Sequence, residues 1–368
     1  MQQAHRALFI GMSLALSITL AACQPAAAPE AAAKQAETPT IRVSGLAYRS
    51  MAWQVSLAAL PANMSKEQLQ ATLQKRLDAA NDVLSTYQST TELMRFNRAS
   101  VGSWHDISPT LQHALSRALQ VSAQMASLSV AANAYDITVA PLVNLWGFGP
   151  TDKVATVPSD AAIAHAKANV GWQYVQLESK LNRAQKLKAV SIDLSSVGEG
   201  AAVDELSAAL QELGINDYLI SVAGTLKARG QRADGSAWRI AIERPDGSGS
   251  AEQLVALGEG SLSTSGSYRN FFERNGVHYS HTIDARTGKP ITHSGVSVTV
   301  ISPVATDATL ADAWATALNV LAPDVALSVA DTLGLAIYVI ERKDGSFVAR
   351  HSAAFKEYLP VASDAGGE

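Results

Sequence analysis

The chain has 368 residues, of which 47% are hydrophobic and 17% are charged, and its formal net charge is −4. This apolar content is enough for a large buried core, and the length allows one to three domains. The weakly acidic charge argues against a protein that binds nucleic acid through a basic surface. Cys23 is the only cysteine in the sequence, so the fold cannot depend on an internal disulfide.

The first 23 residues have the pattern of an export signal. Arg6 supplies a positive charge, and the apolar run over residues 7–20 is short for a membrane-spanning helix. The letters LAAC at 20–23 resemble the bacterial lipobox, whose cysteine becomes lipidated. We therefore expect a lipoprotein signal peptide over 1–22 and a lipid such as palmitate on Cys23. An ordinary cleaved signal without a lipid is the alternative.

Residues 23–40 are rich in Ala and Pro and show no hydrophobic period, which is typical of a flexible tether. The predicted location is the cell envelope, with the protein anchored by its lipid and facing the periplasm. Gln24 stands where an aspartate would favour retention at the inner membrane. This mildly favours the outer membrane, and the inner membrane stays open.

Beyond residue 40, helix-like and strand-like segments follow one another without a regular βαβ order. Ser65 and Gln68 have the spacing of a capping box, and Ser108-Pro109 is a second helix start. The expected helices are 65–84, 109–125, 159–169, 201–213, 307–321 and 325–333. The expected strands lie within 41–57, 174–177, 187–194, 218–222, 238–243, 296–301 and 335–340. The mixture predicts an α+β fold, with one folded domain over 41–360.

Four stretches hold more polar and glycine residues than a buried core needs, namely 133–150, 192–204, 263–270 and 281–290. In the second stretch, a strand end is followed by Gly198 and Gly200 and then by a helix. Exposed N–H groups at a helix N-terminus favour a phosphate, and glycines let the backbone approach it. Ordinary strand–turn–helix packing explains the same pattern, so this stretch alone does not decide between the two.

Two pairs of polar residues suggest further chemistry. Asp312 and Thr316 are four residues apart, so they share one face of a helix, and their oxygens are hard ligands suited to Mg²⁺. An aspartate in solvent and a threonine bonded to its own helix is the alternative. His281 lies three residues before Asp284, and a histidine near a carboxylate can act as a general base. The alternative is a purely structural histidine, which is the more common role of a lone histidine.

Taken together, these stretches resemble the ApbE-type family of FAD:protein FMN transferases in order and spacing, over about residues 45–345. The strings that carry the resemblance are YDITVAPLVNLWGFG at 135–149, STSGSY at 263–268, SHTIDARTGKP at 280–290 and ADAWATA at 311–317. The resemblance implies a two-lobed α+β fold related to the T-fold, with FAD as substrate in a cleft. It further implies Mg²⁺ on the diphosphate and transfer of FMN to a Thr or Ser hydroxyl of an acceptor flavoprotein, with release of AMP.

The resemblance also implies roles for individual residues. The implied FAD-binding positions are Met51, Tyr87, Ala134, Tyr135, Asp136, Asp193, Glu199 and Ile283. The implied magnesium ligands are the carbonyl of Ser196 and the side chains of Asp312 and Thr316. His281 matches the family histidine that is proposed to activate the acceptor hydroxyl.

The chain departs from the family pattern at several positions. Glu199 stands where many members have a lysine, which removes a positive charge and puts a phosphate role there in question. Tyr135 replaces a more common Phe, a mild change. Ala223 replaces a usual Gly and Ala285 a usual Pro, and we expect looser turns there without loss of chemistry.

The resemblance points to an acceptor in a membrane redox complex, such as a subunit of a sodium-pumping NADH:quinone oxidoreductase, facing the same compartment as the anchored protein. No nucleic-acid partner is expected. Two other functions remain open from the sequence. One is a Mg²⁺-dependent FAD pyrophosphatase, in which water replaces the acceptor hydroxyl. The other is a flavin-binding lipoprotein without catalytic activity.

Overall fold

The computed structural model describes residues 40–48, 50–150, 156–268, 270–302 and 307–360. Its central element is an eight-stranded sheet in which every neighbouring pair is antiparallel. In spatial order the strands are β1 (Ile41–Ala47), β2 (Met51–Leu57), β6 (Tyr218–Val222), β7 (Thr225–Arg229), β10 (Gly260–Gly266), β15 (Gly295–Ser302), β16 (Ala336–Lys343) and β17 (Ser346–His351).

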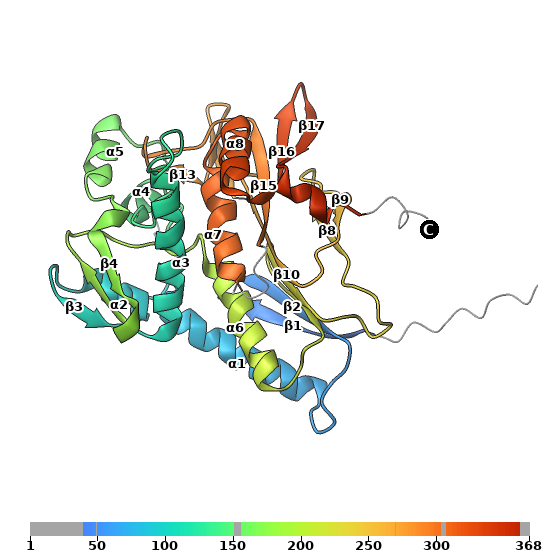
Figure 1. Ribbon diagram of the computed structural model, residues 1–368. Coiled ribbons are helices and arrows are strands. Elements are labelled where there is room, and N and C mark those ends of the chain that lie inside the picture. The colour runs from blue at the N-terminus through green and yellow to red at the C-terminus, as the bar shows by residue number, and fades with distance from the viewer. Residues whose placement is uncertain (1–39, 49, 151–155, 269, 303–306, 361–368) are drawn as a thin grey trace, which may run out of the picture. The chain divides into compact units, whose positions relative to one another are not determined.

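Three long helices pack on this sheet, and a fourth, α3 (Pro109–Ala126), packs on those helices and on the small sheet that contains β4 (Val175–Glu178) (Figure 1). The three are α1 (Lys66–Leu84), α6 (Gly198–Glu212) and α7 (Ala308–Asn319). Helix α7 contacts β10 and β15 on one side and α3 and α6 on the other, whereas α1 contacts β1 and α6. The shorter helices are α2 (Glu92–Arg98), α4 (Ala140–Leu145), α5 (Asp160–Lys167) and α8 (Pro323–Leu333). The α+β class predicted from the sequence is confirmed.

Small antiparallel sheets complete the fold. One has three strands in the order β3 (Trp104–Asp106), β5 (Arg183–Lys186), β4 (Val175–Glu178). The two-stranded sheets pair β8 (Ile240–Glu243) with β9 (Ala251–Val255), β11 (Phe271–Arg274) with β12 (Val277–Ser280), and β13 (Ile283–Asp284) with β14 (Lys289–Pro290). Short 3₁₀ helices lie at Trp172–Tyr174, Ser179–Leu181 and Ala354–Tyr358.

The predicted helix starts are explained by their caps. The Ser65 hydroxyl accepts a hydrogen bond from the Gln68 N–H, and the Gln68 side chain accepts one from the Ser65 N–H, so the capping box is complete. Ser108 caps α3, and Pro109 occupies its first position, where no N–H donor is needed. Both capped helices bury their apolar face in the core, as the leucine spacing predicts.

Helix α7 is buried almost all round, because it lies between the sheet and two other helices. Its alanines keep the helix narrow enough for close packing. The tightest approach is to Gly200 in α6, where an added Cβ would lie 2.4 Å from the Ala308 carbonyl oxygen and 2.6 Å from the Thr309 Cα. Position 200 therefore accepts only glycine without movement of one helix backbone.

One expected strand is wrong. Residues 187–194 are not a strand, and the strand in this region is β5, which ends at Lys186. Val190, Ile192 and Leu194 are buried and Leu187 is exposed, and the Asn97 side chain takes the place of a strand partner at Ile192. It donates to the Ile192 carbonyl oxygen and accepts from the Ile192 N–H, both at 2.8 Å. Local propensity could not reveal a partner 95 residues away.

The remaining boundaries differ by a few residues, as is usual for sequence-based assignment. Helix α6 starts at Gly198 rather than at 201 and ends at Glu212, and Gly214 follows its C-cap with a φ of 73°, which suits a glycine that ends a helix. No helix in the described ranges is long and apolar enough to cross a membrane. The predicted signal peptide, Cys23 and most of the tether lie outside the described residues.

We predict that Gly200→Ala lowers the free energy of unfolding by about 1–3 kcal/mol, because the new methyl group overlaps the α7 backbone. Gly198→Ala is the matched control in the same helix, since its Cβ would lie 4.0 Å from Tyr48 and meet nothing nearer. Urea unfolding of both variants measures the difference. Equal midpoints would show that the two helices are not in tight contact.

Candidate active site

A cavity of about 530 Å³ opens between the sheet, α6, α7 and the segments around β12 and β13, a size typical of sites for small molecules. All four polar stretches singled out in the sequence contribute to its wall. The predicted site residues that line it are Met51, Tyr87, Tyr135, Asp136, Asp193, Ser196, Glu199, His281, Ile283, Asp312 and Thr316. Segments up to 265 residues apart in sequence are thus brought together, as the resemblance required.

Ala134 differs from the other predicted residues, because it is fully buried and is not among the residues that line the cavity. Its carbonyl oxygen accepts a hydrogen bond from the Ala285 N–H at 3.1 Å. A proline at 285 could not make this bond. The turn expected to be looser at Ala285 is therefore tied to the cavity wall.

The turn at Ala223 is also well held. The Ala223 N–H donates to the Ala52 carbonyl oxygen at 3.0 Å, and the Gly224 N–H donates to Glu199 at 2.8 Å. The φ of Ala223 is 46°, in the left-handed region, where a residue with a Cβ costs roughly 1 kcal/mol more than glycine. The departure from glycine introduces backbone strain rather than looseness.

Asp312 projects from α7 against the first turn of α6. Its Oδ2 accepts a hydrogen bond from the Gly200 N–H at 2.9 Å, and its Oδ1 accepts one from the Ser263 hydroxyl at 3.2 Å. Burial, followed by the negative charge of Glu199, raises the pKa of Asp312 well above its usual range. Thr316 lies one turn farther along the same helix and faces the same cavity.

A chain of hydroxyl groups connects Asp312 to Glu199. Ser263 Oγ lies 2.7 Å from Thr225 Oγ1, which in turn lies 3.3 Å from Glu199 Oε2. Two hydroxyl protons cannot fill three contacts, so all three are satisfied only when one carboxyl group is protonated. This proton count agrees with the raised pKa of Asp312.

The cavity wall is strongly acidic. Its carboxylates belong to Asp136, Asp193, Glu199, Glu243 and Asp312, and none of the described residues that line it is Lys or Arg. Among the described lining residues, an anionic ligand such as a diphosphate would meet no Lys or Arg side chain. A bound divalent cation would offset both the wall and the ligand, and Asp312, Thr316 and Ser196 supply the oxygen donors that Mg²⁺ prefers. The residues present therefore fit such a cation.

Two of these carboxylates also organise loops. Asp136 accepts hydrogen bonds from the Thr138 N–H and hydroxyl and from the Trp172 N–H. Asp193 accepts one from the Ser195 N–H at 2.8 Å, which shapes the turn that leads to Ser196. The Ser196 hydroxyl is in turn 2.8 Å from the Tyr135 hydroxyl. This part of the cavity wall is thus fixed by side-chain hydrogen bonds rather than by regular strands.

His281 follows β12 and is half-buried at the cavity. Its Nδ1 lies 3.0 Å from the Asn270 carbonyl oxygen, and because a carbonyl only accepts, Nδ1 carries the proton. The tautomer assigned from this bond leaves Nε2 with a lone pair. Burial lowers the pKa of His281, and the hydrogen bond with Asn270 opposes this shift only in part. The ring is therefore a neutral proton acceptor at pH 7.

The carboxylate suggested as a neighbour of His281 has a different role. Asp284 binds the Arg286 guanidinium through both oxygens, with Nη2 to Oδ2 at 2.8 Å, and accepts from the Arg286 N–H. It thereby closes the turn before Gly288. The backbone carbonyl of Asn270, and not Asp284, orients the imidazole.

Several cavity residues were missed from the sequence. Thr264, Gly266 and Tyr268 belong to a string that was recognised but given no role, whereas Glu243 comes from a strand that looked ordinary. Asn270 contacts His281 through its backbone carbonyl, so the identity of its side chain does not reveal this contact. The STSGSY string was the one sequence signal for these residues. It indicates the segment but not which of its atoms face the cavity.

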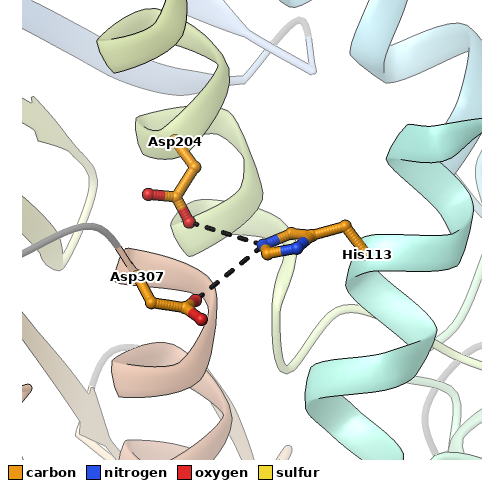
Figure 2. A group of neighbouring side chains, drawn as sticks. All are labelled: His113, Asp204 and Asp307. Carbon is orange, nitrogen blue, oxygen red and sulfur yellow. Dashed lines mark ion pairs between the residues drawn. The ribbon is translucent and has the colours of Figure 1, made fainter. Parts of the chain in front are cut away.

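A second polar cluster lies outside the cavity, where His113 on α3 approaches Asp204 on α6 and Asp307 before α7 (Figure 2). Its Nε2 is 3.8 Å from a carboxylate oxygen of each aspartate. Asp204 also binds Lys227 at 2.9 Å, and Asp307 pairs with Arg117.

These partners explain the cluster without a metal ion. Asp204 accepts from the Thr309 N–H and hydroxyl, and Asp307 accepts from the Leu310 N–H, so both carboxylates cap α7. Burial alone would raise the pKa of Asp204, but the interaction with His113 and the charge of Lys227 lower it to about 2. The cluster fixes the start of the helix that carries Asp312, and no sequence pattern indicated it.

Comparison with known proteins gives a consistent result. A family model described as the ApbE family matches residues 50–339. An FAD:protein FMN transferase of Klebsiella pneumoniae (strain 342) is 39% identical over 350 residues, which cover 94% of this chain and 96% of that protein. An FAD:protein FMN transferase of Escherichia coli (strain K12) is 40% identical over 330 residues, which cover 88% of this chain and 91% of that protein.

Solved structures show the same similarity. The apo form of the flavinyl transferase ApbE from Pseudomonas stutzeri has a TM-score of 0.77 and 36% identity, covering 87% of this chain and 97% of that one. The flavin transferase ApbE from Vibrio cholerae has a TM-score of 0.76 and 31% identity, covering 87% of this chain and 100% of that one.

We predict that His281 titrates below its ordinary value of 6.5, since burial disfavours the imidazolium. Between the lowered pKa and 6.5 the unfolded chain binds more protons than the native one, so the free energy of unfolding falls as the pH falls through this window. The NMR titration of the His281 ring, assigned with His281→Gln, measures the pKa. A value above 6.5 would contradict the burial of the ring.

Proposed function

Because the chain belongs to the ApbE family, we propose that it is an FAD:protein FMN transferase, which moves the FMN part of FAD onto a hydroxyl of an acceptor protein and releases AMP. The observation that carries the proposal is the cavity in which Asp312 and Thr316 lie in one wall with His281 in another. A simple flavin-binding protein would need neither a cation site nor a proton acceptor. Their combination favours group transfer at phosphorus.

In this reaction His281 Nε2 accepts the proton of the acceptor Thr or Ser hydroxyl, which attacks the flavin-side phosphorus of FAD. A P–O bond to the acceptor forms, the P–O bond of the diphosphate bridge breaks, and AMP leaves with the electrons of that bond. The Asn270 carbonyl keeps the imidazole in the tautomer that can accept a proton. Catalysis then consists of positioning and electrostatic stabilisation, with no covalent enzyme intermediate.

Magnesium is part of the proposal. Asp312, Thr316 and the Ser196 carbonyl would hold Mg²⁺, which when bound would neutralise charge that builds on the diphosphate. The acidic wall supports this assignment, because the described lining has no Lys or Arg to meet the diphosphate. Glu199, in place of the family lysine, accepts from Gly224 and belongs to the same acidic wall.

The remaining residues of the cavity wall are assigned to the flavin part and the nucleotide part of FAD. Met51 and Tyr87 are proposed to contact the flavin, and Tyr87 is 71% exposed, so its ring is available for stacking on an incoming ring system. Tyr135, Asp136, Asp193 and Ile283 are proposed to shape the nucleotide part of the site. Ala134 would support this wall from behind through its bond to Ala285.

The location of the protein also belongs to the proposal. The lipobox at 20–23 supports lipidation of Cys23 and anchoring in the cell envelope on the periplasmic side. The acceptor would then be a flavoprotein subunit of a membrane redox complex exposed to that compartment. Mass spectrometry of the mature N-terminus tests the lipid.

The central test is incubation with FAD, Mg²⁺ and a candidate acceptor, followed by in-gel flavin fluorescence and the mass of the acceptor. A covalent FMN adduct together with AMP supports transfer. Release of free FMN and AMP without an adduct would instead identify a pyrophosphatase.

We predict that His281→Gln lowers the rate of transfer by about 10²–10⁴-fold, because a general base is lost, whereas FAD still binds. Flavin fluorescence titration measures binding, and the rate of adduct formation measures transfer. His278→Gln, a change of the exposed histidine on β12, is the matched control. An unchanged rate in His281→Gln would remove this residue from the base role.

We predict that Asp312→Asn lowers transfer by at least roughly a hundredfold, because the charge that holds the cation is worth several kcal/mol in such sites. The amide can still accept from the Gly200 N–H, so the thermal midpoint should stay close to that of the wild type. Addition of EDTA to the wild type should have the same effect as the substitution. Transfer at the wild-type rate in Asp312→Asn would refute the cation site.

A further inference from the structure

The hydroxyl groups of Thr225 on β7 and Ser263 on β10 lie behind the cavity wall, between Glu199 and Asp312. They are 0% and 1% exposed, and neither is among the residues that line the cavity. The two residues are directly opposite each other in the β7–β10 pair, so the sheet register sets the 2.7 Å between their oxygens. Neither has a part in the reaction described above.

We propose that Thr225 and Ser263 are positioning residues, which hold the Asp312 carboxylate in the orientation that binds the divalent cation and link it to Glu199. With both carboxylates ionised, Ser263 donates to Asp312 Oδ1 at 3.2 Å, and the single Thr225 proton goes either to Ser263 Oγ at 2.7 Å or to Glu199 Oε2 at 3.3 Å. Groups that orient a metal ligand in this way contribute about 10–100-fold to metal affinity. The inference rests on the proposed cation site.

Packing alone does not require these hydroxyls, because valine or alanine would fill the same space in a strand. A neighbour on the same strand shows the difference. Ser261 is also fully buried and points to the same side of β10 as Ser263, yet its hydroxyl has no hydrogen-bond partner among the described residues. Ser263 and Thr225, by contrast, each contact a carboxylate of the cavity.

Thr225 offers a matched pair of substitutions. Thr225→Val keeps the shape of the side chain and removes the hydroxyl, whereas Thr225→Ser keeps the hydroxyl and removes a methyl group. A positioning role makes the valine variant defective and spares the serine variant. A packing role makes the serine variant the more damaged of the two. Ser263→Ala and Ser261→Ala provide a second pair on β10.

The readout is binding of Mn²⁺ to the full chain saturated with FAD in the absence of acceptor, followed by electron paramagnetic resonance of the free ion. We expect Thr225→Val and Ser263→Ala to raise the Kd for Mn²⁺ about tenfold. Thr225→Ser and Ser261→Ala should stay within about twofold of the wild type. In transfer assays the defect should appear as a higher cation requirement, with kcat largely recovered at saturating Mg²⁺.

The outcomes separate this inference from the proposed function, with Asp312→Asn as the reference. If Asp312→Asn weakens Mn²⁺ binding but Thr225→Val and Ser263→Ala do not, the positioning role is wrong and the cation site stands. If Thr225→Ser is as weak as Thr225→Val, the residue acts by packing and the inference also fails. If Asp312→Asn binds Mn²⁺ like the wild type, the cation site and the inference fail together.

Discussion

The close contact between α6 and α7 is the constraint on which the site depends. At Gly200 the two backbones are near enough that an added Cβ would overlap Ala308, and the Gly200 N–H donates directly to Asp312. This single bond fixes a buried carboxylate against the first turn of a neighbouring helix. A larger residue at 200 would move α7, and with it the side chains of Asp312 and Thr316. The contact at Gly200 therefore determines both how the two helices pack and where the Asp312 carboxylate lies.

The electrostatics of the site follow from this arrangement. A carboxylate held in the core beside Glu199 is destabilised by burial and by like charge, which is the physical cause of its raised pKa. The hydroxyls of Ser263 and Thr225 spread this charge through hydrogen bonds but cannot neutralise it. In the proposed mechanism a divalent cation would resolve the conflict, and the anionic diphosphate of FAD would then become an acceptable ligand in an acidic cavity. His281, kept neutral by burial, would be the complementary proton acceptor.

Much of this could be predicted from local sequence. The caps at Ser65 and Ser108, the helical spacing of leucines and the α+β mixture need only short-range rules, because each depends on residues within a few positions. The strings around Asp312 and His281 identified the family, and the comparisons support that identification over most of the chain. The strand expected at 187–194 failed because its partner is the distant side chain of Asn97.

By itself, the sequence determined which segments carry chemistry, since glycines, hydroxyls and paired acids are local features. Only the tertiary structure decided which atoms act. The structure shows that the partner of His281 is the Asn270 carbonyl and not Asp284, which binds an arginine instead. It also shows that Ser263 links Asp312 to the sheet. These contacts join β-strands and helices far apart along the chain. Their geometry depends on sheet register and helix packing, which no short window of sequence contains.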